Sequence, residues 1–173
     1  MRARGDTARA KSHYETARRL EPFFAPAAVN LADLYREQGD DASGERVLRE
    51  AIKKTPSVAA LHYSLGLLLA RRKDLPAAIV ELKRAADIEP DNIEMNYGLG
   101  VALYSAGRRA EGIAQLDRSW RRHPGDRTTL TGLISYVREQ GDQARAESLA
   151  MSLVQISPED PRARALLDEL RRK

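Results

Sequence analysis

The chain contains no cysteine, which excludes disulfide bonds, thiolate catalysis and cysteine-based metal sites. Aromatic residues make up only 5% of the 173 residues, so small and aliphatic side chains must do most of the packing. No stretch approaches the roughly 18 apolar residues of a membrane span. Residues 1–19 also lack the apolar core of a secretory signal. We therefore expect a cytoplasmic location for this chain, or a periplasmic one if it is a fragment of an exported parent.

Neither sign of charge dominates the chain. Its 29 basic and 25 acidic residues leave a net charge of +4, which is typical of a solvated surface of mixed sign. A phosphate-binding stripe needs basic residues that repeat along one face together with exposed aromatics, and no such stripe is visible. Nucleic-acid binding therefore remains only an alternative, for which the sequence offers one basic cluster. That cluster is Arg118, Arg121, Arg122, His123 and Arg127.

The residues that usually carry chemistry are scattered. His13, His62 and His123 have no ligand-like spacing, and the sequence contains no HExxH, GxSxG or glycine-rich phosphate loop. We predict a protein that is not an enzyme and that uses no cofactor or metal.

Prolines recur at a fixed interval of 34 residues, and they are Pro22, Pro56, Pro90, Pro124 and Pro158. Residues 59–92 display the repeating unit best. When this unit is numbered 1 to 34, positions 7, 8, 11, 20, 24, 27 and 32 hold Leu65, Gly66, Leu69, Ala78, Leu82, Ala85 and Pro90. The same positions of the next copy hold Leu99, Gly100, Leu103, Gly112, Leu116, Ser119 and Pro124. A fixed period of this length indicates an array of repeats.

This pattern resembles the tetratricopeptide repeat (TPR), and the resemblance covers practically the whole chain. It implies an all-α fold, a right-handed α–α superhelix in which each repeat is a pair of helices. Two departures stand out. Repeat position 4, often tryptophan in the family, is Ala28, His62, Asn96 or Leu130 here. In the fourth copy, Ile134 replaces the small residue at position 8 and Ala150 the large residue at position 24.

The repeat frame divides the chain into residues 1–24, 25–58, 59–92, 93–126, 127–160 and 161–173. The four middle segments are complete repeats, and residues 161–173 form a polar capping helix. Residues 1–24 read as the orphan second helix of a truncated repeat, with a turn at Gly5 and Asp6. We expect its uncovered apolar face to mark a fragment of a longer array or a surface for self-association. Phe23 and Phe24 are expected to pack between this helix and the first full repeat.

Local signals fix the turn inside each repeat. Gly39 can adopt the left-handed conformation that ends a helix, and Asp40 can cap the next helix by accepting backbone N–H groups. Asp74 and Asp142 repeat this cap, whereas Arg108 interrupts it in the third copy. Small residues at positions 8, 20 and 27 are expected where the two helices approach each other most closely.

In the family, positions 2, 5, 9, 12 and 13 of the first helix face a concave groove. The resemblance implies that the residues at these positions contact a protein or peptide partner. We expect Tyr63, Tyr97 and Tyr104 to form an aromatic floor, and the alternative is that the same rings fill gaps between adjacent first helices. The groove residues are Val29, Asp33, Arg36, Tyr63, Leu67, Arg71, Tyr97, Val101, Tyr104 and Arg138.

The arginines at 36, 71 and 138 are expected to pair with charges on the partner. Some family members clamp a carboxylate along this wall, but Asp33 would repel one. The expected function is therefore that of a protein-interaction scaffold or adaptor. An alternative is a repeat region of a larger bacterial protein, because residues 23–92 are similar to the repeat tails of some multihaem cytochromes. No CxxCH haem site is present in this sequence.

Overall fold

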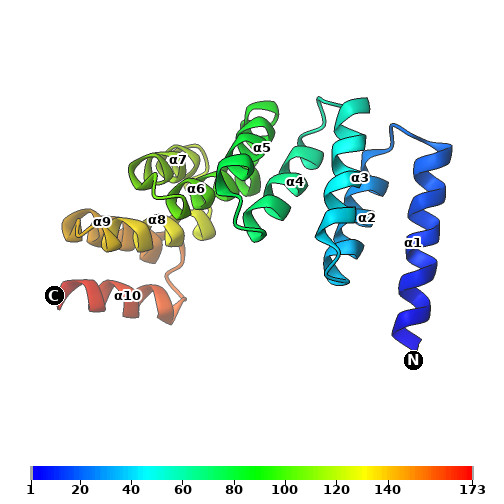
Figure 1. The fold of residues 1–173 in the computed structure, drawn as a ribbon. Helices are drawn as coiled ribbons and strands as arrows, with labels where there is room; N and C mark the ends of the chain where they lie inside the picture. Colours follow the sequence, from blue (N-terminus) through cyan, green and yellow to red (C-terminus); the bar gives the residue numbers. More distant parts are fainter. Residues whose placement is uncertain (1, 173) are drawn as a thin grey trace. The chain divides into compact units, whose positions relative to one another are not determined.

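The computed structural model describes the backbone of residues 2–172 and the side chains of residues 9–172. Within this part of the chain every regular element is an α-helix, as the sequence predicts (Figure 1). The ten helices are α1 (Arg2–Leu20), α2 (Ala25–Glu37), α3 (Asp41–Lys54), α4 (Ala59–Arg71), α5 (Leu75–Ile88), α6 (Ile93–Ser105), α7 (Arg109–Arg122), α8 (Arg127–Glu139), α9 (Gln143–Ile156) and α10 (Pro161–Arg171).

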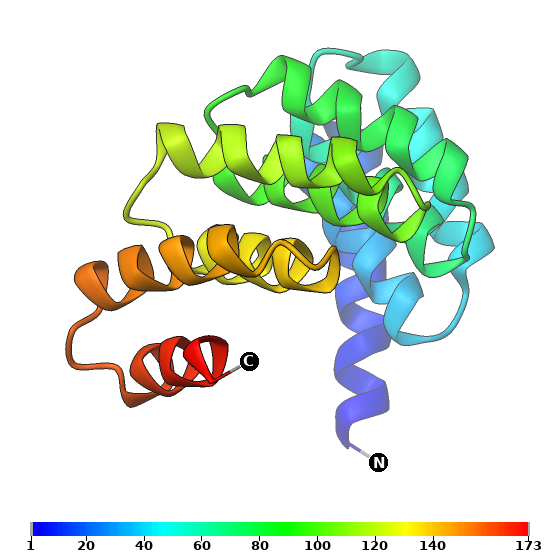
Figure 2. The same ribbon diagram turned by 90° about the vertical axis from the view of Figure 1, so that its left-hand side faces the viewer.

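The helices fall into two units, residues 1–90 and residues 91–173. In the first unit, α1 packs against α2, α2 and α3 form an antiparallel pair, and α4 packs against both α3 and α5. In the second unit, the pair α6–α7 is followed by the pair α8–α9, and α10 covers α9 (Figure 2). Each unit has its own core of aliphatic side chains.

The predicted caps are confirmed. The carboxylates of Asp40, Asp74 and Asp142 each accept a hydrogen bond from the backbone N–H of the residue three positions later, at 3.0, 3.2 and 3.1 Å. Arg108, at the same place in the third repeat, makes no side-chain cap and instead pairs with Glu111 at 2.6 Å. Gly39 has the expected positive φ of 76°.

The turn predicted at Gly5 and Asp6 is wrong. The backbone of α1 is helical without interruption from Arg2 to Leu20. Glycine inside a helix costs only about 0.5–1 kcal/mol relative to alanine. The continuous helix keeps its backbone hydrogen bonds and is therefore favoured.

The expected packing of Phe23 and Phe24 is also wrong. Their side chains are 70% and 48% exposed, and neighbouring Leu20 is 72% exposed. The buried positions at the start of α2 are held by Ala25, Ala27 and Ala28. Because these side chains are so small, helices approach closely here and the two rings are left on the surface.

A close contact between positions 8 and 24 joins the two helices in the middle repeats. A Cβ atom on Gly66 would lie 2.6 Å from Cγ of Leu82, and one on Gly100 would lie 2.6 Å from Cδ2 of Leu116. Both leucines are almost completely buried. The backbone of the first helix therefore forms the wall against which the leucine packs, and only glycine fits it.

The fourth repeat builds the same contact in reverse. Ile134 at position 8 is 1% exposed, and Ala150 at position 24 is 0% exposed. Compared with the other repeats, the large side chain is on the first helix instead of the second, and the small side chain is on the second helix instead of the first. The large residue at position 8 and the small residue at position 24 thus compensate for each other in volume, and both belong to the core of the second unit.

Repeat position 4 forms a second link, with position 23 of the same repeat. His62 Nδ1 lies 2.7 Å from Oε2 of Glu81 and its Nε2 lies 3.0 Å from the Pro56 carbonyl. In the third repeat, Gln115 Nε2 donates to Oδ1 of Asn96 at 2.7 Å. The first and fourth repeats fill the same two positions with the apolar pairs Ala28–Val47 and Leu130–Leu149, all buried.

The glycines at repeat position 20 give a matched test of helix approach. A Cβ on Gly112 would lie 2.8 Å from both the Gly100 carbonyl oxygen and the Tyr104 backbone nitrogen, whereas one on Gly44 would lie no closer than 3.2 Å to any neighbour. We expect Gly112→Ala to lower the free energy of unfolding by about 1–3 kcal/mol through overpacking. Gly44→Ala should change it by about 1 kcal/mol or less. Urea unfolding followed by circular dichroism measures both, and equal effects would contradict this difference in helix spacing.

The His62–Glu81 pair gives a second test. Glu81→Leu leaves the buried Nδ1 of His62 without its acceptor, so we expect it to destabilise the protein by about 1–3 kcal/mol. The double variant His62→Leu/Glu81→Leu reproduces the apolar pair of the fourth repeat and should be more stable than Glu81→Leu alone. The same urea titration decides between them. A double variant less stable than the single one would show that the polar pair is not exchangeable.

Candidate functional site: the tyrosine depression

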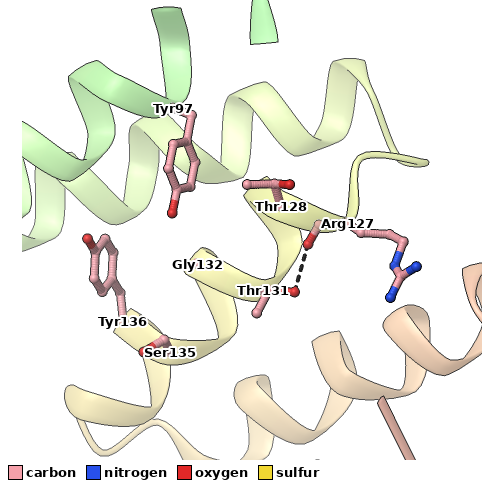
Figure 3. A pocket seen from close by; sticks show the side chains of 7 residues that line it. All are labelled: Tyr97, Arg127, Thr128, Thr131, Gly132, Ser135 and Tyr136. Carbon is pink, nitrogen blue, oxygen red and sulfur yellow. Dashed lines mark hydrogen bonds between the residues drawn. The ribbon is translucent and has the colours of Figure 1, made fainter. Parts of the chain in front are cut away.

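An open depression of about 640 Å³ lies on the second unit, where α6 and α8 meet. Figure 3 shows the seven residues that line it. Six of them come from α8 and one from α6, and they are Tyr97, Arg127, Thr128, Thr131, Gly132, Ser135 and Tyr136. None of the seven is acidic.

Gly132 makes room for the ring of Tyr97. A Cβ atom at this position would lie 2.9 Å from Cε2 of Tyr97 and 3.3 Å from its hydroxyl oxygen. The half-buried Tyr97 ring therefore reaches down from α6 onto the backbone of α8, as Figure 3 shows. The neighbouring ring of Tyr136 rises from α8, one helical turn after Gly132.

The ring of Tyr136 stacks on the ring of Tyr104. The two rings are nearly parallel, at an interplanar angle of 3° with centroids 3.7 Å apart. Tyr104 is only 8% exposed, and its hydroxyl accepts a hydrogen bond from Gln140 Nε2 at 3.3 Å. Tyr104 thus fills a gap between first helices, which is the second of the two roles considered for the tyrosines from the sequence. It supports the depression without lining it.

Apart from Arg127, the polar groups that line the depression are hydroxyls. Burial raises the pKa of the Tyr136 hydroxyl, and the nearby Tyr97, Tyr104 and Glu139 add to this effect. Tyr136 therefore stays protonated at physiological pH and can donate a hydrogen bond. Thr131 Oγ1 donates to the Arg127 carbonyl at 2.7 Å (Figure 3). Arg127 itself pairs with Asp160, and its guanidinium points away from the tyrosine rings.

The predicted groove residues of the first unit, which belong to α2 and α4, lie in different environments. Val29 and Tyr63 are half-buried, whereas Leu67 is 45% exposed. Asp33 and Arg36 form an exposed ion pair of 3.2 Å. In the second unit, Val101 is half-buried and lies outside the depression.

Each of the three arginines predicted to meet charges on a partner already contacts a carboxylate of this chain. Arg36 pairs with Asp33, Arg71 with Asp41, and Arg138 with Glu169 at 3.2 Å. Exposed ion pairs of this kind contribute only about 0–1 kcal/mol, so a partner's carboxylate can replace the internal one.

Of the lining residues, Tyr97 is among the groove residues predicted from the sequence, whereas Tyr136 and Gly132 are not. These two occupy repeat positions 10 and 6, outside the positions that face the groove in the family. One signal was available: Gly132 is the only glycine or alanine in the first helix of its repeat. A single glycine in a helix costs stability and so suggests a close neighbour.

Other site chemistries find no support in the described residues. Among them, no group of three His, Cys, Asp or Glu side chains is placed to hold a metal ion. The same residues include no helix both long and apolar enough to cross a bilayer. In the basic cluster, Arg121 pairs with Asp117 at 2.8 Å and Arg118 donates to Gln115 Oε1 at 2.6 Å. The cluster is thus largely engaged within the protein.

The chain consists of tandem pairs of helices that pack closely through small residues and carry exposed aromatic side chains. These features are typical of helical-repeat interaction scaffolds. Residues 2–45 and 30–93 match one tetratricopeptide repeat model, and residues 69–134 match a second. The chain therefore belongs to the tetratricopeptide repeat family, whose members bind protein partners.

Individual relatives agree with this assignment. A TPR repeat-containing protein of Pseudomonas aeruginosa is 30% identical over 144 residues, which cover 83% of this chain and 58% of that protein. The chain spans only 10% and 11% of the lengths of two further bacterial relatives.

Solved structures show the same solenoid fold. The crystal structure of MamA matches 91% of this chain and 92% of its own, with a TM-score of 0.78 and 19% identity. YrrB, described as a TPR protein with an unusual peptide-binding site, matches 99% of this chain and 86% of its own, with a TM-score of 0.73 and 18% identity.

The burial of Tyr104 changes what its removal should do. An open floor ring, the first of the two roles expected for Tyr104 from the sequence, could be removed with little effect on stability. Because the ring is buried against Tyr136, we now expect a loss of roughly 3–5 kcal/mol, as for other buried aromatic side chains. Tyr104→Phe keeps the stacked ring and should cost about 1 kcal/mol or less. Thermal unfolding of both variants measures this, and an unchanged midpoint for Tyr104→Ala would contradict a supporting role.

Proposed function

We propose that the tyrosine depression on α6 and α8 binds an extended segment of a partner protein. The observation that carries this proposal is the pair of rings of Tyr97 and Tyr136, fixed beside a bare stretch of helix backbone at Gly132. Tyrosine supplies rigid apolar area with a polar tip and is enriched at interface hot spots. Both rings are supported before a partner arrives, which lowers the entropic cost of binding.

The lining indicates the chemistry of the bound segment. Two rings offer apolar contact for an aliphatic or proline side chain, and the hydroxyls of Thr128, Thr131 and Ser135 offer hydrogen bonds to a peptide backbone. Acidic side chains of the segment would exchange with Asp160 on Arg127 or with Glu169 on Arg138 at the margin. YrrB, which has the same fold, is described as having a peptide-binding site.

We propose that the chain acts by holding its partner and catalyses no reaction. Reactions at protein sites commonly use a nucleophile paired with a base, or two carboxyl groups. The lining of the depression offers hydroxyls with neither a histidine nor a carboxylate beside them.

A peptide library selected against the whole chain tests the proposal. Tyr97→Ala should weaken the selected peptides by about tenfold or more, as at other interface tyrosines, while the melting midpoint stays close to that of the parent because this ring is half-buried. Ser105→Ala, which changes an exposed residue at the end of α6 outside the lining, is the matched control. Selected peptides that bind Tyr97→Ala as tightly as the parent would refute the assignment of the site.

Self-association through the N-terminal helix is a second candidate. Leu20, Phe23 and Phe24 form an exposed apolar group where α1 meets α2, and such groups often mark interaction surfaces. Light scattering should show a mass that rises with concentration, and Phe23→Ser/Phe24→Ser should abolish the rise. A mass that stays monomeric at all concentrations would rule this surface out.

A further inference from the structure

Four buried polar atoms belong to residues at the corner formed by the end of α7 and the start of α8. They make no hydrogen bond to any residue that the structure describes, and they are Ser119 Oγ, Trp120 Nε1, His123 Nε2 and Thr129 Oγ1. Ser119 is 4% exposed and Thr129 is 0% exposed. Buried polar groups in folded proteins almost always have a partner, so four unpartnered ones at one corner need an explanation.

The local backbone holds these side chains together. Ser119, Trp120 and His123 share the last turn of α7, where the His123 N–H donates to the carbonyls of both other residues. Asp126 then ties this turn to α8. Its N–H donates to the His123 carbonyl at 2.9 Å, and its carboxylate accepts from the Thr129 N–H at 2.7 Å.

The corner is polar only at this point of the array. Ser119 occupies repeat position 27, which holds Ala51 and Ala85 in the two preceding repeats. Thr129 occupies position 3, where the three preceding repeats carry the buried residues Ala27, Leu61 and Met95. Apolar side chains thus suit both positions, and the two hydroxyls here are not required by packing.

We propose that this corner is a binding site for internal water, bridging the two hydroxyls, the Trp120 indole N–H and the His123 ring. A buried water needs two to four polar partners, among them both donors and acceptors. The indole only donates, whereas the hydroxyls and the ring nitrogen can donate or accept. An anion is disfavoured because the C-terminal end of α7 carries negative partial charge and Asp126 lies beside it.

This water connects the end of α7 to α8, the helix that supplies six of the seven residues lining the tyrosine depression. Thr129 lies in the first turn of α8, between Thr128 and Thr131 of the lining. The water therefore fixes that turn onto α7. The inference itself does not depend on peptide binding.

Two substitutions test the site, because the proposal and its alternative predict opposite changes in protein stability. Ser119→Ala copies the first and second repeats, and Thr129→Val removes a hydroxyl at nearly constant shape. If both hydroxyls bind water, each variant raises the unfolding equilibrium constant, on the order of tenfold. If they are simply unpartnered, their removal relieves a penalty and stabilises the protein. Ser148→Ala, at an exposed position of α9, is the control and should change nothing.

Water itself is detected by NMR on the same variants. Trp120 is the only tryptophan of the chain, so its indole proton is assigned without ambiguity. We expect a cross-peak to long-lived water that persists in each single variant, which excludes relay through that hydroxyl. Stabilisation by either substitution, or an indole proton without such a cross-peak, would overturn the proposal.

Discussion

The contact between repeat positions 8 and 24 is the constraint on which this structure depends. In the middle repeats the leucine at position 24 presses directly against the helix backbone at Gly66 or Gly100. This contact fixes the spacing of the two helices in these repeats, where positions 20 and 27 hold small residues. The 34-residue pattern in the sequence therefore follows from the distance at which the two helices of a repeat pack.

The constraint is on paired volume rather than on particular residues. The fourth repeat satisfies it with Ile134 facing Ala150, and the position 4–23 pair is polar in two repeats and apolar in two. Cores tolerate such exchanges when the total volume is kept. The same principle produces the candidate site, where Gly132 allows the ring of Tyr97 to lie on α8.

The sequence predicted the features that recur in every repeat, because each repeat position can be compared across four copies. The all-α fold and the aspartate caps follow from this. It failed at Gly5, where α1 continues through the expected turn, and at Phe23, whose side chain is 70% exposed. Tyr104 belongs to a third kind, because its burial depends on Tyr136 and Gln140 of the next repeat. Repeat positions identify a face of a helix, but particular partners decide which side chains on that face remain open.

In the proposed account, unit 91–173 binds a partly apolar peptide segment on α6 and α8. Amide NMR during titration with a library-selected peptide tests this account most directly. It predicts that the largest shifts fall at Gly132 and its neighbours Thr131 and Ser135. Shifts concentrated on α7 and α9, for example at Ala114 and Ser148, with Gly132 unchanged, would contradict it.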